Sequence, residues 1–162
     1  MSISTMNDLF VETLKDVYSA EKQILKALPG MAKKARAGEL KEAFESHKKE
    51  TEQQIERLEK VFEMLDITPR GKKCEAIDGI IREAKEGMQE IDKDDVLDAG
   101  IIGSAHTIEH YEICRYVSLV QWAKDLGLED AAKLMEQTLE QERNADNRLT
   151  RIDEKTLRHA AA

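Results

Sequence analysis

The 162-residue chain has the length of a single domain, and it combines 36% charged residues with 41% hydrophobic residues, two prolines and only 4% aromatic residues. This composition favours long helices over strands. The net charge of −8, without a basic stripe interleaved with aromatic residues, argues against nucleic acid as a partner. We therefore expect one all-α domain over residues 1–162.

The N-terminal residues lack a basic region followed by an apolar run, and no stretch approaches the roughly 18 apolar residues of a membrane span. Cys74 and Cys114 lie in different predicted helices and form no CxxC motif, which argues against an iron–sulfur centre within one chain. We expect a soluble, cytoplasmic protein that makes no membrane contact.

The first predicted helix begins near Thr5 or Asn7, whose side chains can cap it. It runs until Pro29 and Gly30, where we expect a kink or an end. Residues 31–37 can continue it for a turn or two.

Gly38 interrupts the pattern, and a second helix is predicted over residues 39–65. The short connection makes these two helices antiparallel neighbours. A crossover segment at about 66–95 follows, and its apolar spacing predicts a short amphipathic helix within residues 72–95.

Two further long helices are predicted over residues 94–126 and 129–158, with Gly127 closing the first of them. The chain therefore predicts a four-helix bundle with an additional short helix in the long crossover between helices 2 and 3.

Three of the long helices carry a carboxylate at the centre of their apolar stripe, and on the second helix Glu50 lies one turn beyond the stripe residue His47, on nearly the same face. These central glutamates are Glu21, Glu50, Glu112 and Glu142. Buried carboxylates without a partner are costly and repel one another, and no lysine or arginine occupies the stripe positions. Divalent cations are the obvious counter-charge, so the pattern predicts a metal site inside the bundle.

The two halves of the chain look like one motif used twice. Glu50 follows Glu21 by 29 residues, and Glu142 follows Glu112 by 30 residues. This repeat predicts pseudo-two-fold symmetry around two metal ions about 3.5–4 Å apart. Four glutamates also match the charge of two divalent cations.

Three further side chains are candidate ligands. Glu109 lies one turn from Glu112 on the same stripe and is either a fifth carboxylate ligand or a hydrogen-bond acceptor. His47 stands three residues before Glu50, and for it metal ligation and packing in the core are equally open. Asp146 either ligates a metal or accepts a hydrogen bond from His47 or from a water.

Other polar residues near the stripes have simpler interpretations. His106 and His110 lie off the stripe, and we expect His110 to face solvent or a partner subunit. Tyr18 and Tyr116 can hydrogen-bond to ligand carboxylates or act in redox chemistry, although core packing with a satisfied hydroxyl is the simpler interpretation.

The sequence closely resembles the YciE/YciF stress-associated proteins, a ferritin-like group, from about Asp8 to Leu157. The resemblance rests on these motifs: Asp16-Val-Tyr-Ser-Ala-Glu-Lys-Gln23, His47 with Glu50-Thr51, Arg57-Leu-Glu59, Asp98-Ala99, Glu109-His-Tyr-Glu-Ile113, and Glu140-Gln-Glu142 with Asp146. It implies a single ferritin-like four-helix bundle, a homodimer, and a di-iron or related dimetal centre.

One motif of the wider ferritin-like superfamily is missing. Its enzymes usually carry Glu-x-x-His on the second and fourth helices, but the third residue after Glu50 is Gln53, and the third after Glu142 is Ala145. Ligands beyond the four central glutamates therefore stay open.

The first functional hypothesis is a stress-response protein with two iron ions that reacts with peroxide or dioxygen, as a non-haem di-iron oxidoreductase or peroxidase. The chain has no cysteine-rich electron-transfer module, so turnover needs an outside reductant. A manganese pair that disproportionates peroxide would avoid this need. The alternatives without catalysis are a metal-binding or iron-buffering protein, a storage cage, and a structural stress protein.

Overall fold

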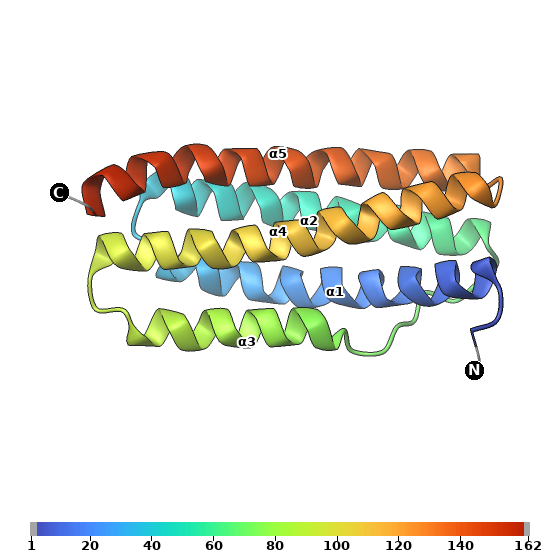
Figure 1. Ribbon diagram of the computed structural model, residues 1–162, viewed down its shortest axis with the longest axis horizontal. Helices are drawn as coiled ribbons and strands as arrows, with labels where there is room; N and C mark the ends of the chain where they lie inside the picture. Colours follow the sequence, from blue (N-terminus) through green and yellow to red (C-terminus); the bar gives the residue numbers. More distant parts are fainter. Residues whose placement is uncertain (1–2, 161–162) are drawn as a thin grey trace.

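The computed structural model describes the backbone of residues 3–160 and the side chains of residues 3–156. All regular structure within this part of the chain is helical, which confirms the all-α prediction. The helices are α1 (Met6–Lys34), α2 (Gly38–Met64), α3 (Glu75–Glu90), α4 (Asp94–Asp125) and α5 (Glu129–Ala160). The four long helices lie side by side, and the shorter α3 packs against α1 and α4 (Figure 1).

Helix α1 begins at a reciprocal cap. The Asp8 backbone N–H donates to the Thr5 hydroxyl over 3.1 Å, and the Thr5 N–H donates to the Asp8 carboxylate over 3.0 Å. Thr5, rather than Asn7, is therefore the capping residue. The helix continues through Pro29 to Lys34. Proline removes one backbone donor, while Met31 just beyond it is buried, so core packing stabilises the last turn.

Helix α2 begins at Gly38, the residue that we expected to interrupt the pattern. The two residues just before it are held by a distant part of the chain. The backbone N–H groups of Arg36 and Ala37 donate to the two carboxylate oxygens of the buried Asp98 on α4, both over 2.7 Å. These charge-assisted hydrogen bonds fix the connection between α1 and α2.

A glycine ends α4, and a side chain from α1 holds the start of α3. Gly127 ends α4 with a φ of 74°, the left-handed conformation that glycine adopts without strain. At the start of α3, the side-chain amide of Gln23 on α1 accepts from the Cys74 N–H over 2.8 Å and donates to the Cys74 carbonyl over 3.2 Å. Gln23 therefore attaches the N-terminus of α3 to α1.

The apolar core consists of two clusters. The α3-side cluster takes residues from all five helices, including Leu28, Ile77 and Ile101. The N-terminal cluster takes residues from the four long helices, including Phe10 and Leu119. A polar belt separates them, and it is formed by the buried residues Glu21 on α1, His47 on α2, Glu109 and Glu112 on α4, and Glu142 on α5. Within the described residues, no helix has the length and apolar character that crossing a bilayer requires.

Candidate metal centre

The polar belt contains a group of buried potential metal ligands: His47 from α2, Glu109 and Glu112 from α4, and Glu142 from α5. One ligand atom from each of these four side chains lies within 4.8 Å of the other three. None of the four residues is more than 5% exposed. Glu21 on α1 is fully buried beside them. All four long helices therefore contribute to one polar interior.

Most polar atoms of this group have no hydrogen-bond partner. Both carboxylate oxygens of Glu112 and Glu142, both ring nitrogens of His47, and one oxygen each of Glu21 and Glu109 are unpaired. Buried polar groups are almost always hydrogen-bonded. Imidazole nitrogens and carboxylate oxygens are common ligands of iron and manganese. The unpaired donor set therefore fits a bound cation.

The distances around His47 support this fit. Its Nε2 atom lies 3.4 Å from Oε1 of Glu109 and 4.0 Å from Oε2 of Glu142. Its Nδ1 atom lies 3.6 Å from Oε2 of Glu50. These separations are too long for hydrogen bonds. A cation about 2.0–2.2 Å from each ligand atom joins atoms up to about 4 Å apart. His47 is therefore well placed to share a cation with a neighbouring carboxylate.

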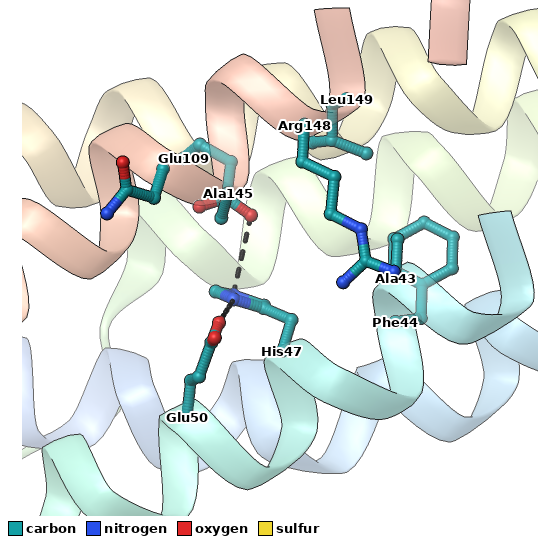
Figure 2. Close-up of a pocket in the computed structure, with 9 residues that line it drawn as sticks. Ala43, Phe44, His47, Glu50, Glu109, Ala145, Arg148 and Leu149 are labelled. Carbon is teal, nitrogen blue, oxygen red and sulfur yellow. Dashed lines mark ion pairs between the residues drawn. The ribbon is translucent and has the colours of Figure 1, made fainter. Parts of the chain in front are cut away.

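Glu50 lies at the edge of the group. Its side chain is 35% exposed, unlike those of the other three central glutamates. It lines a pocket of about 120 Å³ together with His47 and Glu109, between α2 and α5 (Figure 2). Phe44 and Leu149 form part of the apolar wall of this pocket. The pocket leads from the surface to the buried group.

Burial shifts the proton affinity of these carboxyl groups. The pKa of Glu112 is raised well above its usual value, mainly by burial and then by the charges of Glu142 and Glu21. Burial and the charge of Glu142 raise the pKa values of Glu21 and Glu109 in the same way. Burial also raises the pKa of Glu142, against the lowering effect of His47. Without a cation, these carboxyl groups therefore hold their protons to a higher pH than isolated glutamates do.

The two candidate tyrosines take different positions. The buried Tyr116 hydroxyl donates a short hydrogen bond to Glu21, and burial together with the Glu21 charge raises the pKa of Tyr116. The expected contact between Tyr116 and a carboxylate of the belt is therefore present. Tyr18 donates instead to Glu59 over 2.8 Å, away from the group. Tyr116 orients one oxygen of Glu21 and leaves the other free.

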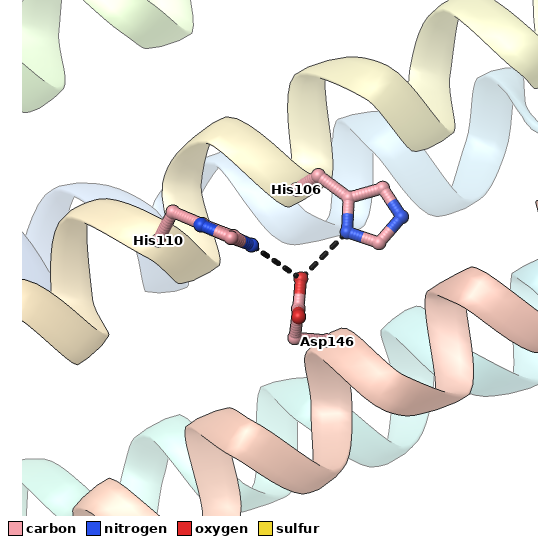
Figure 3. Close-up of side chains that lie close together, drawn as sticks. All are labelled: His106, His110 and Asp146. Carbon is pink, nitrogen blue, oxygen red and sulfur yellow. Dashed lines mark hydrogen bonds and ion pairs between the residues drawn. The ribbon is translucent and has the colours of Figure 1, made fainter.

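The structure places Asp146 with His106 and His110 rather than with His47. Its Oδ1 atom lies 2.6 Å from Nδ1 of His106 and 3.2 Å from Nε2 of His110 (Figure 3). These three residues form a group separate from the buried one. His110 faces solvent, as expected from its position off the stripe, with a side chain that is 70% exposed.

Some neighbouring polar residues were not identified from sequence as parts of the belt. Gln54 on α2 is fully buried next to Glu142, and its side chain favours the ionised form of that carboxylate. Arg57 donates to Gln141 over 2.6 Å and to Thr138 over 3.3 Å. Gln54 lies on the same helical stripe as His47, so its spacing was the available signal.

Comparisons with known proteins agree over almost the whole chain. The family described as a domain of unknown function, DUF892, matches residues 5–162. Protein YciF of Escherichia coli strain K12 is 41% identical over 151 residues, which cover 93% of this chain and 91% of YciF.

Two solved structures are also similar. The crystal structure of the E. coli stress protein YciF has a TM-score of 0.93 at 39% identity, covering 96% of this chain and 99% of that one. YcfI of Rhodopseudomonas palustris has a TM-score of 0.90 at 45% identity, covering 92% and 95% of the two chains. The chain therefore belongs to the DUF892 family and is a homologue of YciF.

Proposed function

We propose that this protein is a dimetal carboxylate protein of the stress response, and that it binds two iron ions and reacts with peroxide or dioxygen. The observation that carries the proposal is the buried, unpaired set of carboxylate and imidazole atoms in the polar belt. The stress context comes from the resemblance to E. coli YciF, which is described as a stress protein. We further propose that α1, α2, α4 and α5 constitute one ferritin-like four-helix bundle with α3 as its crossover helix.

The polar belt and its edge offer ligands for two cations. His47, Glu109, Glu112 and Glu142 are close enough to share one cation. Glu21 and Glu50 lie on α1 and α2 beside this set and supply carboxylates for a second cation. When bound, two Fe(II) ions supply the electrons that reduce peroxide or dioxygen. The carboxylates offset the additional positive charge that this oxidation creates.

Protein groups control protons and access at this site. Ligand carboxyl groups with raised pKa values must release their protons before they bind a cation, so metal uptake and proton release are coupled. The Tyr116 hydroxyl keeps Glu21 oriented. The pocket beside His47 and Glu50 has room for a small molecule such as peroxide, because one water occupies about 30 Å³ in the liquid.

Two alternatives use the same residues. A manganese pair is compatible with a carboxylate-rich donor set and would disproportionate peroxide without an outside reductant. A protein that only buffers iron would bind the metal without turnover. Both alternatives are outcomes of the same experiment, and the mass of the protein in solution tests the homodimer that the family resemblance implies.

The test is anaerobic reconstitution of the metal-free protein with Fe(II), followed by elemental analysis and by titration with peroxide. We expect about two irons per chain and stoichiometric oxidation. Glu21→Ala and Glu142→Ala should both lose iron, whereas the exposed Glu140→Ala should bind it normally. Iron uptake without oxidation would indicate buffering. A folded protein that takes up neither iron nor manganese would show that the belt is only a buried polar network.

A further inference from the structure

A second group of potential metal ligands lies at the surface of the protein, outside the polar belt. It consists of His106 and His110 on α4 and Asp146 on α5. Figure 3 shows the Asp146 carboxylate between the two imidazole rings. One ligand atom from each of the three residues lies within 4.8 Å of the others. In the positions that they occupy here, none of the three residues takes part in the proposed buried metal centre.

The helix geometry explains why the two histidines act together. Residues four apart on a helix share one face, and histidine pairs with this spacing bind metals in known sites. The imidazole rings are 6.4 Å apart between centroids, at an interplanar angle of 76°. Both rings direct a nitrogen to the same Asp146 oxygen, at 2.6 Å and 3.2 Å. Two helices therefore supply three donors that converge on one point.

We infer that His106, His110 and Asp146 form a surface binding site for a divalent transition-metal cation. Two imidazole nitrogens and one carboxylate oxygen suit Zn²⁺, Co²⁺, Ni²⁺ and Cu²⁺ better than Mg²⁺ or Ca²⁺, which prefer oxygen ligands alone. Donor atoms around a cation at about 2.0–2.2 Å lie roughly 3 Å apart. The observed separations are close to that value, so small side-chain rotations admit the ion. Solvent supplies the remaining ligands beside the exposed His110 ring.

The surface site does not depend on the proposed function of the buried centre. The two groups share no residue, and a protein without iron in the polar belt can still bind a cation at the surface. In this arrangement Asp146 serves the surface site. The two sites are neighbours nevertheless, because Glu109 lies on α4 between His106 and His110 in sequence and turns to the interior.

The experiment uses Zn²⁺ as the probe and a background in which the buried centre is disabled by Glu21→Ala and Glu142→Ala. Isothermal titration calorimetry of this folded, metal-free protein should show one bound Zn²⁺ per chain. Adding His106→Ala and His110→Ala, or Asp146→Asn, should weaken binding by at least about tenfold, since removing even a supporting residue of a metal site costs about 10–100-fold. Adding Thr107→Ala, at an exposed position on the same helix, should change nothing.

Two results would overturn the inference. The first is equal Zn²⁺ affinity and stoichiometry with and without the two histidines. The second is a folded background protein that binds no Zn²⁺, which would leave the group as an ion pair between α4 and α5. Circular dichroism checks folding in every variant. Failure of the wild-type protein to bind iron would count against the buried centre alone, because the background removes that centre from the titration.

Discussion

Replacing Glu112 by leucine should stabilise the metal-free protein and weaken its binding of Fe(II). Glu112 is 1% exposed, and neither of its carboxylate oxygens has a hydrogen-bond partner. Its pKa is raised by burial and by the charges of Glu142 and Glu21. At pH 8 the folded protein therefore loses free energy whether the Glu112 side chain is charged or protonated. Replacing buried ionic groups by apolar side chains of similar volume stabilises proteins by about 1–4 kcal/mol.

This gain can be measured by thermal unfolding of chelator-treated protein at pH 8. For a domain of this size, each kcal/mol raises Tm by about 2–4 °C. The variant should therefore melt several degrees above the wild type. A matched control is Glu140→Leu on α5, which is exposed and should change the free energy of unfolding by no more than about 0.5 kcal/mol.

Anaerobic Fe(II) should then favour the wild type. A cation that binds only the folded state adds about 2.7 kcal/mol at one hundred times its Kd. The Glu112→Leu variant, which lacks one ligand, should gain much less. A metal-free variant that is clearly less stable than the wild type would refute the reasoning, because it would show that Glu112 has favourable partners in the folded protein.

Three further predictions follow from contacts in the fold and the belt. The folded-state pKa values of Glu21, Glu109 and Glu112 lie above the unfolded value of about 4.3. Protonation of these groups therefore stabilises the folded state, fully below that pH, and the stabilisation is lost as the pH rises through the folded-state pKa values. Metal-free protein should therefore have a higher urea midpoint at pH 5.5 than at pH 8, and the opposite order would contradict the shifts. Asp98→Ala removes two charge-assisted hydrogen bonds to the connection before α2 and should lower the free energy of unfolding by about 2–4 kcal/mol in urea titrations, whereas an unchanged midpoint would mean that water replaces these two bonds. Tyr116→Phe should weaken Fe(II) binding by about 10–100-fold with little effect on the fold, and unchanged affinity would show that the hydroxyl does not orient Glu21.

The helix boundaries were predictable wherever their signals are local. Thr5 and Asp8 form a cap within one turn, and Gly127 ends α4 in a left-handed conformation. The start of α2 was harder to predict, because the two residues before it are held by Asp98, which is remote in sequence. The continuation of α1 beyond Pro29 likewise depends on tertiary packing that local propensity does not contain.

The interior glutamates followed from helical periodicity alone. Glu21, Glu112 and Glu142 occupy the centres of their apolar stripes, and all three are buried. Glu50 lies on the flank of its stripe, where a small rotation of α2 decides between the core and the surface. The structure leaves it partly exposed, while His47 occupies the buried position.

Asp146 shows a different limit of sequence reasoning. Its spacing from Glu142 placed it near the stripe, but spacing on one helix says nothing of the side chains that a neighbouring helix presents. Its Oδ1 atom lies 2.6 Å from His106 and 3.2 Å from His110 on α4, and its charge also raises the pKa of Glu109 in the belt. A role for Asp146 as a ligand of the buried metal stays a prediction. Whether His47, Glu109 and Glu50 contact a metal directly remains a prediction.

The division of the apolar core into two clusters separates the packing that stabilises the protein from the proposed metal centre. Each cluster joins all four long helices on its own side of the polar belt. An ion can therefore leave the belt while both ends of the protein stay closed. Substitutions in the belt can also alter which cation is held without disturbing the packing that keeps the chain folded. Metal should therefore slow the hydrogen exchange of amides near the middle of the long helices, and it should leave the exchange rates in the two apolar clusters unchanged.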